Sequence, residues 1–264
     1  MTTLIDNAVK RRIKAGEPTA GAWLHLCSPI AAEIMAEAGF DWLLIDMEHG
    51  HGDYQTLLAQ LQAMRGSPVT PIVRVEWNDP AVLKRVLDLG AQGVMIPWVS
   101  GHEACEAAVR ACKYPPDGMR GMAGSHRAAG FGTHATEYWN RANAETLVMI
   151  QVETVETLRD IDAVLAVPGV DVAFIGPVDL SAALGHVGDP AHPEVQAAIA
   201  RVEEAAKRAG VALGTISRSW EEARALYARG YLVVTLASDA GLLAREAGGL
   251  AARFRAERAG SRGV

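Results

Sequence analysis

Two carboxylates in this sequence have the types and positions expected of metal ligands. Glu153 follows the apolar run Leu147–Val152, and Asp179 follows the apolar run 170–175 after a short turn. Two carboxylates with water in the remaining positions suit a hard divalent cation such as Mg²⁺ or Mn²⁺. Either acid alone is more often a helix N-cap or a solvated surface group, and Asp179 retains the capping alternative. Their shared position at the ends of neighbouring strands favours the metal site.

An arginine and a histidine stand at two further strand ends. Arg74 ends the apolar run in TPIVRVEW, where it either pairs with a structural acid or faces an anionic ligand. His49 follows Asp46 in IDMEHG and is a candidate general base, with an ordinary loop histidine as the alternative. The pair His49 and His51 is a weak metal signal without further ligands. His25 is the other histidine expected to line a site.

The lysines argue against imine chemistry. None of the five falls in a predicted strand or at its end, where a Schiff-base nucleophile would meet a carbonyl. They are Lys10, Lys14, Lys84, Lys113 and Lys207. The sequence also lacks G-x-S-x-G and the glycine motifs that hold nucleotides. We therefore expect a metal ion and an arginine to stabilise negative charge in the reaction, and we expect no nucleotide cofactor and no Schiff-base lysine.

The elements that position these residues alternate between short apolar strands and longer helical patterns. The predicted strands are 20–26, 41–47, 71–75, 93–97, 147–152, 170–175, 211–215 and 232–236. The predicted helices are 29–38, 54–65, 80–89, 102–112, 193–209, 219–228 and 238–254. Eight strand–helix units in about 250 residues predict a (β/α)₈ TIM barrel, an α/β fold, in which reacting groups gather at the carboxyl ends of the strands. A doubly wound sheet, the rival fold, normally carries G-x-G-x-x-G after its first strand, and this sequence does not.

One barrel domain then accounts for residues 1–264. We expect residues 1–18 to cap the bottom of the barrel and residues 255–264 to form a flexible tail. Two long connections, 113–145 after strand 4 and 176–192 after strand 6, are interpreted as extended βα loops that cover the substrate.

Composition limits the class of protein. The chain has 264 residues, half of them apolar, and a net charge of −6, so no basic field is available for nucleic acid or an anionic membrane. No run approaches the ~18 apolar residues of a membrane span, and the N-terminus lacks the apolar core of a signal peptide. Three cysteines, Cys27, Cys105 and Cys112, fit a reduced cytoplasmic compartment.

Five runs of the sequence, in this order and with barrel spacing, resemble one enzyme family. The runs are FDWLLIDMEHG, VRVEWNDP, KYPPDGMRG, IQVETVET and GVDVAFIGPVDLS. They are similar to the metal-dependent (class II) 4-hydroxy-2-oxoheptanedioate and 2-dehydro-3-deoxyglucarate aldolases of the phosphoenolpyruvate/pyruvate superfamily. The resemblance covers residues 10–254, nearly the whole chain.

The resemblance implies a role for each matching residue. Glu153 and Asp179 would be the ligands of Mg²⁺, Mn²⁺ or Co²⁺, and Gln151 would line the metal site. Arg74 would hold the keto oxygen and stabilise the enolate. His49 would act as base through a metal-bound water, paired with Asp88 of a neighbouring subunit in a homo-oligomer, usually a hexamer. Gly176, Pro177, Val178 and Asp179 would bind the substrate, and the backbone N–H groups around Val178 and Asp179 would receive its carboxylate.

The implied activity is a carbon–carbon (aldehyde) lyase. Such an enzyme reversibly cleaves a 4-hydroxy-2-keto acid to an aldehyde and pyruvate, or a close analogue such as hydroxypyruvate, through a metal-stabilised enolate. Oxaloacetate decarboxylation and citramalyl-type lyase chemistry would use the same site and are the alternatives. A non-catalytic barrel that binds keto acids is disfavoured because the full residue set is present.

The stretch 122–134, MAGSHRAAGFGTH, departs from the family pattern and makes the aldehyde the least defined part of the expectation. Arg120 and Arg127, in and beside this stretch, are candidates for contact with a distal carboxylate or for bridging subunits.

Overall fold

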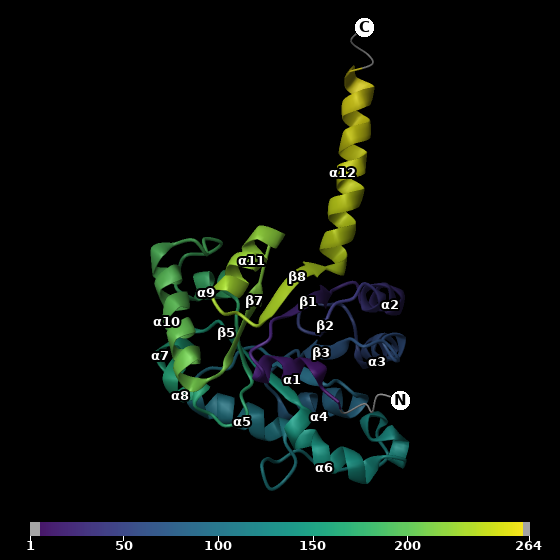
Figure 1. Ribbon diagram of the computed structural model, residues 1–264, viewed down its shortest axis with the longest axis vertical. Helices are drawn as coiled ribbons and strands as arrows, with labels where there is room; N and C mark the ends of the chain where they lie inside the picture. The colour runs from purple at the N-terminus through teal and green to yellow at the C-terminus, as the bar shows by residue number, and fades with distance from the viewer. Residues whose placement is uncertain (1–5, 261–264) are drawn as a thin grey trace.

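Eight parallel strands pair in chain order, and β8 closes against β1, so the sheet forms a complete barrel (Figure 1). The computed structural model describes residues 6–260. The strands are β1 (Thr19–Leu24), β2 (Trp42–Asp46), β3 (Thr70–Arg74), β4 (Gly93–Ile96), β5 (Leu147–Val152), β6 (Val172–Ile175), β7 (Ala212–Ile216) and β8 (Val233–Ser238). The predicted (β/α)₈ barrel is confirmed, and every predicted strand limit lies within two residues of the observed one.

Helices follow the strands and form the outer layer. They are α2 (Pro29–Glu37), α3 (Tyr54–Ala63), α4 (Pro80–Leu89), α5 (His102–Cys112), α7 (Val155–Arg159), α8 (Ile161–Leu165), α10 (Pro193–Ala209), α11 (Trp220–Ala228) and α12 (Asp239–Gly260). Local sequence signals set several limits. The Asp79 side chain caps the first turn of α4, and Gly90 ends that helix in the left-handed conformation.

Large side chains fill the barrel interior, so the barrel is a packed core and not a channel. Trp42 is completely buried there, and a Cβ on Gly21 would lie 2.1 Å from its indole ring. Glycine on β1 therefore makes room for tryptophan on β2. The short helix α1 (Ala8–Lys14) adds Val9 and Ile13 to the interior cluster, beside the amino ends of the strands.

The long connection 113–145 lies at the opposite end of the barrel from the predicted position. It begins after α5 and leads into β5, so it is an αβ connection on the amino-terminal face and not a βα loop over the site. It contains a 3₁₀ helix (Arg127–Gly132) and α6 (Ala135–Glu145), which pack their own small cluster around Tyr114 and Tyr138. The expectation that this connection is a βα loop over the mouth of its own barrel is wrong, because α5 returns the chain to the amino-terminal face before the connection starts.

The connection after β6 does lie on the carboxyl-terminal face. It carries the short helix α9 (Pro177–Ala183) directly after the strand and continues through a loop to α10. The extended loop expected after the sixth strand is therefore present.

The last helix, α12, projects away from the barrel (Figure 1). It continues to Gly260, so the first six residues of the expected flexible tail are helical, and the arginine, alanine and glutamate residues of that segment favour helix. Residues 261–264 of that expected tail lie outside the described part of the chain. Within residues 6–260, no helix has the length and apolar character needed to cross a bilayer.

Candidate active site

Polar side chains from four strand ends meet at the carboxyl-terminal mouth of the barrel, as the sequence predicts. They border two neighbouring cavities of about 440 and 500 Å³. His49, Arg74 and Asp179 line both cavities and so form the boundary between them. Gln151 lines the first cavity and Glu153 the second.

Asp46, the last residue of β2, forms a two-point hydrogen-bonded ion pair with Arg74, the last residue of the adjacent strand β3. Arg74 Nε lies 2.9 Å from Asp46 Oδ1, and Nη2 lies 2.6 Å from Oδ2. The strand register places the two residues directly opposite each other. Both are buried, so this two-point pairing fixes the plane of the guanidinium at the mouth.

Asp46 is held in its charged form by these neighbours. His25 Nε2 lies 3.1 Å from Asp46 Oδ2, and the His49 backbone N–H donates to Oδ1 at 3.3 Å. Burial acts to raise the pKa of Asp46, but the hydrogen bonds from His25 and Arg74 and the charge of Arg74 hold it well below its usual range. His25 lines the first cavity, as expected, and stacks on Trp23 with 5.5 Å between ring centroids.

Glu48 takes the remaining side of the guanidinium. Its Oε2 lies 2.9 Å from Arg74 Nη1. Burial raises the pKa of Glu48, the charge of Arg74 opposes that rise, and the charges of Asp46 and Asp179 add to it. The hydrogen bonds to Asp46 use two of the five guanidinium N–H groups, and Glu48 contributes its charge without a hydrogen bond, so N–H groups on Nη1 and Nη2 remain for a ligand in the mouth.

Glu153 is buried and held from two directions. Its Oε1 accepts from the Trp98 backbone N–H at 2.7 Å, and its Oε2 accepts from Gln151 Nε2 at 2.6 Å. Trp98 adopts a left-handed φ of 52°, a strained conformation for a bulky residue. Burial raises the pKa of Glu153, the Trp98 hydrogen bond and the Arg74 charge oppose this, and Glu48 and Asp179 raise it further.

These residues fit a divalent cation. A Cβ on Gly176 would lie 3.3 Å from Asp179 Oδ2 and 3.7 Å from Glu153 Oε2, so both carboxylates border the same glycine. Gln151 Oε1 is buried beside them and has no hydrogen-bond partner among the described residues. A buried carboxylate whose pKa is raised by burial, a second carboxylate beside it and an unsatisfied buried oxygen together form an environment that a bound cation would relieve.

The first turn of α9 lies beside these acids. Gly176 stands at the N-cap without a side-chain hydrogen bond, and Pro177, Val178 and Asp179 open the helix. All four of these residues line the first cavity. The predicted substrate-binding turn is therefore part of the mouth.

Asp88 is far from this group within one chain. It lies near the end of α4, just before β4 begins, and so at the amino-terminal end of the barrel. Its Oδ1 accepts from Arg120 Nη2 at 2.6 Å and lies 3.7 Å from His126 Nε2. The structure therefore does not bring Asp88 to His49 of the same chain.

Arg120 and Arg127 are structural within the single chain. Arg120 is 2% exposed and packs over the Tyr114 ring at 4.5 Å, and its pKa is raised by the surrounding tyrosines and Asp88 against the effect of burial. Arg127 donates to the backbone oxygens of Leu89 and Leu61, near the ends of α4 and α3. Neither lines the two mouth cavities of its own barrel.

The sequence reasoning missed two arginines that line the first cavity. Arg218 follows β7, and Arg245 lies in the second turn of α12. The signal that identified Arg74 was also available here, because Arg218 stands two residues beyond the end of a strand. No such signal identifies Arg245, because it lies within a helix and not at the end of a strand.

Comparison with known proteins agrees with this geometry. The model of the family described as "HpcH/HpaI aldolase/citrate lyase" matches residues 19–246. A protein of Klebsiella pneumoniae named 4-hydroxy-2-oxo-heptane-1,7-dioate aldolase is 46% identical over 250 residues, which cover 95% of this chain and 94% of that one. An Escherichia coli protein of the same name is 43% identical over 253 residues, covering 96% of this chain and 97% of that one.

A crystal structure from Burkholderia cenocepacia, titled as an aldolase/citrate lyase family protein, superposes with a TM-score of 0.90. It is 41% identical and covers 94% of this chain and 99% of its own. The resemblance inferred from the five sequence runs is confirmed: this chain belongs to the HpcH/HpaI aldolase/citrate lyase family.

Proposed function

We propose that this protein is a divalent-metal-dependent aldolase that reversibly cleaves a 4-hydroxy-2-keto acid to pyruvate and an aldehyde. The observation that carries the proposal is the buried Asp46–Arg74 pair, whose remaining guanidinium N–H groups lie at the same mouth as Glu153 and Asp179. The names of the relatives, 43–46% identical over nearly the whole chain, support the same reaction.

Glu153 and Asp179 would hold an ion such as Mg²⁺, Mn²⁺ or Co²⁺. When bound, the ion supplies a positive charge that stabilises the keto acid and the enolate formed from it. The N–H groups at the start of α9 are not used in helix hydrogen bonds and are free to bind the substrate carboxylate. Gln151 orients Glu153 through its amide N–H.

Arg74 and His49 act on the reacting atoms. His49 removes the proton from the C4 hydroxyl, the C3–C4 bond breaks as the aldehyde carbonyl forms, and the electron pair moves into the C2–C3 bond of pyruvate enolate. Arg74 donates to the C2 oxygen where the negative charge develops, a contribution worth about 100-fold or more in rate. Protonation at C3 then gives pyruvate.

A synthesis assay tests the proposal directly. The protein is incubated with pyruvate and a panel of short aldehydes, with Mg²⁺ or Mn²⁺ or with a chelator. We expect carbon–carbon bond formation that requires the ion. No condensation with any aldehyde under any metal condition would overturn the proposal.

We further propose that the enzyme is a homo-oligomer, with a hexamer as the form that the resemblance implies. The projecting helix α12 exposes Leu243, Leu250 and Phe254, which are each more than 60% accessible and share one face by helical spacing. Ile30 and Ile34 on α2 are equally exposed. Exposed apolar faces of this kind often mark protein–protein interfaces. In a symmetric oligomer, a second copy of the chain can cover both the α12 face and the α2 face.

Oligomerisation would also allow Asp88 of one subunit to lie in the catalytic site of a neighbouring subunit. Because Asp88 and His49 lie at opposite ends of one barrel, their predicted pairing requires Asp88 of a neighbouring subunit. Its carboxylate is partly exposed and is therefore accessible from outside the chain.

We place the enzyme in the cytoplasm. Cys27, Cys105 and Cys112 are free thiols, and burial raises the pKa of Cys105 and of Cys112 to about 12, which keeps both in the unreactive protonated form. Fractionation of cells that produce the protein checks this localisation.

A further inference from the structure

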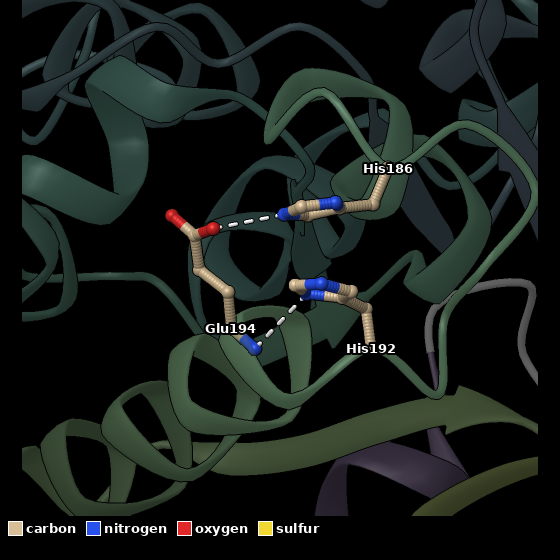
Figure 2. A group of neighbouring side chains, drawn as sticks. All are labelled: His186, His192 and Glu194. Atoms are coloured by element: carbon tan, nitrogen blue, oxygen red, sulfur yellow. Dashed lines mark hydrogen bonds and ion pairs between the residues drawn. The ribbon is translucent and has the colours of Figure 1, made fainter.

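Three potential metal ligands meet on the connection between α9 and α10, outside the barrel mouth. Figure 2 shows His186, His192 and Glu194 side by side, with the two imidazole rings stacked. The ring centroids are 3.4 Å apart, and His186 Nε2 lies 2.8 Å from Glu194 Oε2. One ligand atom from each residue lies within 4.8 Å of both others. The sequence spacing of the histidines gave no indication of this cluster.

We propose that this cluster, the α9–α10 site, binds a divalent ion of the zinc type. Two imidazole nitrogens and one carboxylate oxygen, with a water in the fourth position, form a common tetrahedral Zn²⁺ ligand set. Ligand bonds of about 2.0–2.2 Å place neighbouring ligand atoms roughly 3–3.5 Å apart. His186 Nε2 and Glu194 Oε2, at 2.8 Å, already lie near that spacing, and the ligand atoms of all three residues lie within 4.8 Å of one another.

Small local changes convert the present arrangement into a coordinating one. Stacked rings direct their nitrogen lone pairs in parallel, so the imidazoles must turn about their side-chain bonds for the lone pairs to converge. His192 Nδ1 now accepts a long, 3.3 Å hydrogen bond from the Glu194 backbone N–H at the start of α10. Coordination gives up that bond, and the partial exposure of the side chains leaves room for the rotation.

The ligand chemistry separates this site from the barrel mouth. Glu153 and Asp179 offer only oxygen, which suits Mg²⁺ and Mn²⁺, whereas imidazole nitrogen favours Zn²⁺ and disfavours Mg²⁺. The site lies at the N-terminus of α10, where the helix dipole is positive and would repel a cation held only by neutral ligands. The negative charge of the Glu194 carboxylate offsets this repulsion. An ion here would link the loop that follows α9, the helix that contains Asp179, to the first turn of α10.

Zinc counting by equilibrium dialysis tests the proposal on the full chain. Excess Mg²⁺ is present throughout to occupy the oxygen site at the mouth. We expect His186→Ala and His192→Ala each to bind one Zn²⁺ fewer per chain than the parent protein, and Glu194→Gln to bind Zn²⁺ about tenfold more weakly. His102→Ala, which removes an exposed histidine on α5, is the matched control and should retain the parent count.

Cobalt gives a second readout that depends on coordination geometry. Co²⁺ in the parent protein should show the intense visible bands of a tetrahedral nitrogen–oxygen site, and these bands should be absent in His186→Ala and present in His102→Ala. Equal Zn²⁺ counts in the parent, His186→Ala and His192→Ala would overturn the proposal. So would cobalt bands that survive both histidine substitutions.

Discussion

Asp46 and Arg74 end adjacent strands and face each other across the sheet, joined by hydrogen bonds of 2.9 and 2.6 Å. Neither side chain is free to turn, since Asp46 also accepts from backbone N–H groups of its own loop and Arg74 also contacts Glu48. The pair therefore fixes the direction of the guanidinium N–H groups that remain for the substrate.

Asp46→Asn should lower turnover by about 100-fold, the cost of a small misplacement of a catalytic group. The amide keeps the shape of the side chain but loses the charge that pairs with Arg74. Steady-state kinetics on the parent and variant measure the effect, and Asp53→Asn, at the exposed cap of α3, is the control. Equal turnover in the Asp46 variant and the parent would show that this pair does not position Arg74.

Glu153→Gln and Asp179→Asn should weaken Mn²⁺ binding by two to three orders of magnitude. One negative charge about 4 Å from a unit positive charge is worth about 4 kcal/mol at an effective dielectric constant of about 20. Isothermal titration with Mn²⁺ measures the affinity. Glu156→Gln, which removes an exposed acid from the same cavity, should bind Mn²⁺ like the parent. Parent-like affinity in both site variants would place the ion elsewhere.

Arg218→Ala and Arg245→Ala should each raise KM about five- to tenfold for an aldehyde with a terminal carboxylate. Both guanidinium groups line the first cavity, and a charge-assisted hydrogen bond of 1–1.5 kcal/mol accounts for that change. A neutral aldehyde of the same length should be used equally well by the parent and both variants. Arg224→Ala, on α11, is the matched control. A rise in KM for the neutral aldehyde as well would contradict charge recognition.

The stability of the fold should rise with pH between about 8 and 10.5 because of Lys113. Burial and the charge of Lys10 lower the pKa of Lys113 from 10.5 to about 8. In this range the unfolded chain binds more protons at this site than the folded chain, so the contribution of Lys113 to the unfolding free energy increases by up to about 1.4 kcal/mol per pH unit.

Urea unfolding at pH 8 and pH 10 measures this slope. Lys113→Met should remove the contribution of Lys113 to the pH dependence of the unfolding free energy. Lys207→Met, which changes an exposed lysine on α10, should leave that dependence unchanged. The same pH dependence in the parent and the Lys113 variant would mean that Lys113 titrates normally in the folded state.

Mixing two inactive variants should restore activity if Asp88 completes the site of a neighbouring subunit. His49→Ala and Asp88→Asn chains, unfolded and refolded together, would form some sites that contain both an intact His49 and an intact Asp88. His49→Ala mixed with Arg74→Ala is the control, because those two residues belong to the same barrel mouth and no complete site can form. Mixed oligomers without restored activity would rule out the intersubunit pair.

The sequence was sufficient for the barrel and for most of the mouth, for a physical reason. Strands such as Val172–Ile175 are continuous apolar runs, and in a parallel barrel every strand ends at the same face. Position along the chain alone therefore brought Arg74, Gln151 and Glu153 together.

Features that depend on packing between distant segments could not be predicted in this way. The connection 113–145 is not of this kind: the helix predicted over 102–112 matches α5, so the order strand, helix, connection already places it at the amino-terminal end of the barrel, and its length and composition are a weaker signal than that order. The contact of Asp88 with Arg120 joins α4 to that connection, 32 residues along the chain. Likewise, the meeting of His186 with Glu194 depends on how one loop folds back onto α10.

Solvent deuterium exchange into the methyl group of pyruvate tests the central claim most directly, because it reports enolate formation without the correct aldehyde. With Mg²⁺ or Mn²⁺ present, the parent protein should exchange the methyl hydrogens, a chelator should abolish the exchange, and Arg74→Ala should reduce it by about 100-fold or more. Exchange that proceeds equally with chelator, or equally in Arg74→Ala, would contradict a metal- and arginine-stabilised enolate.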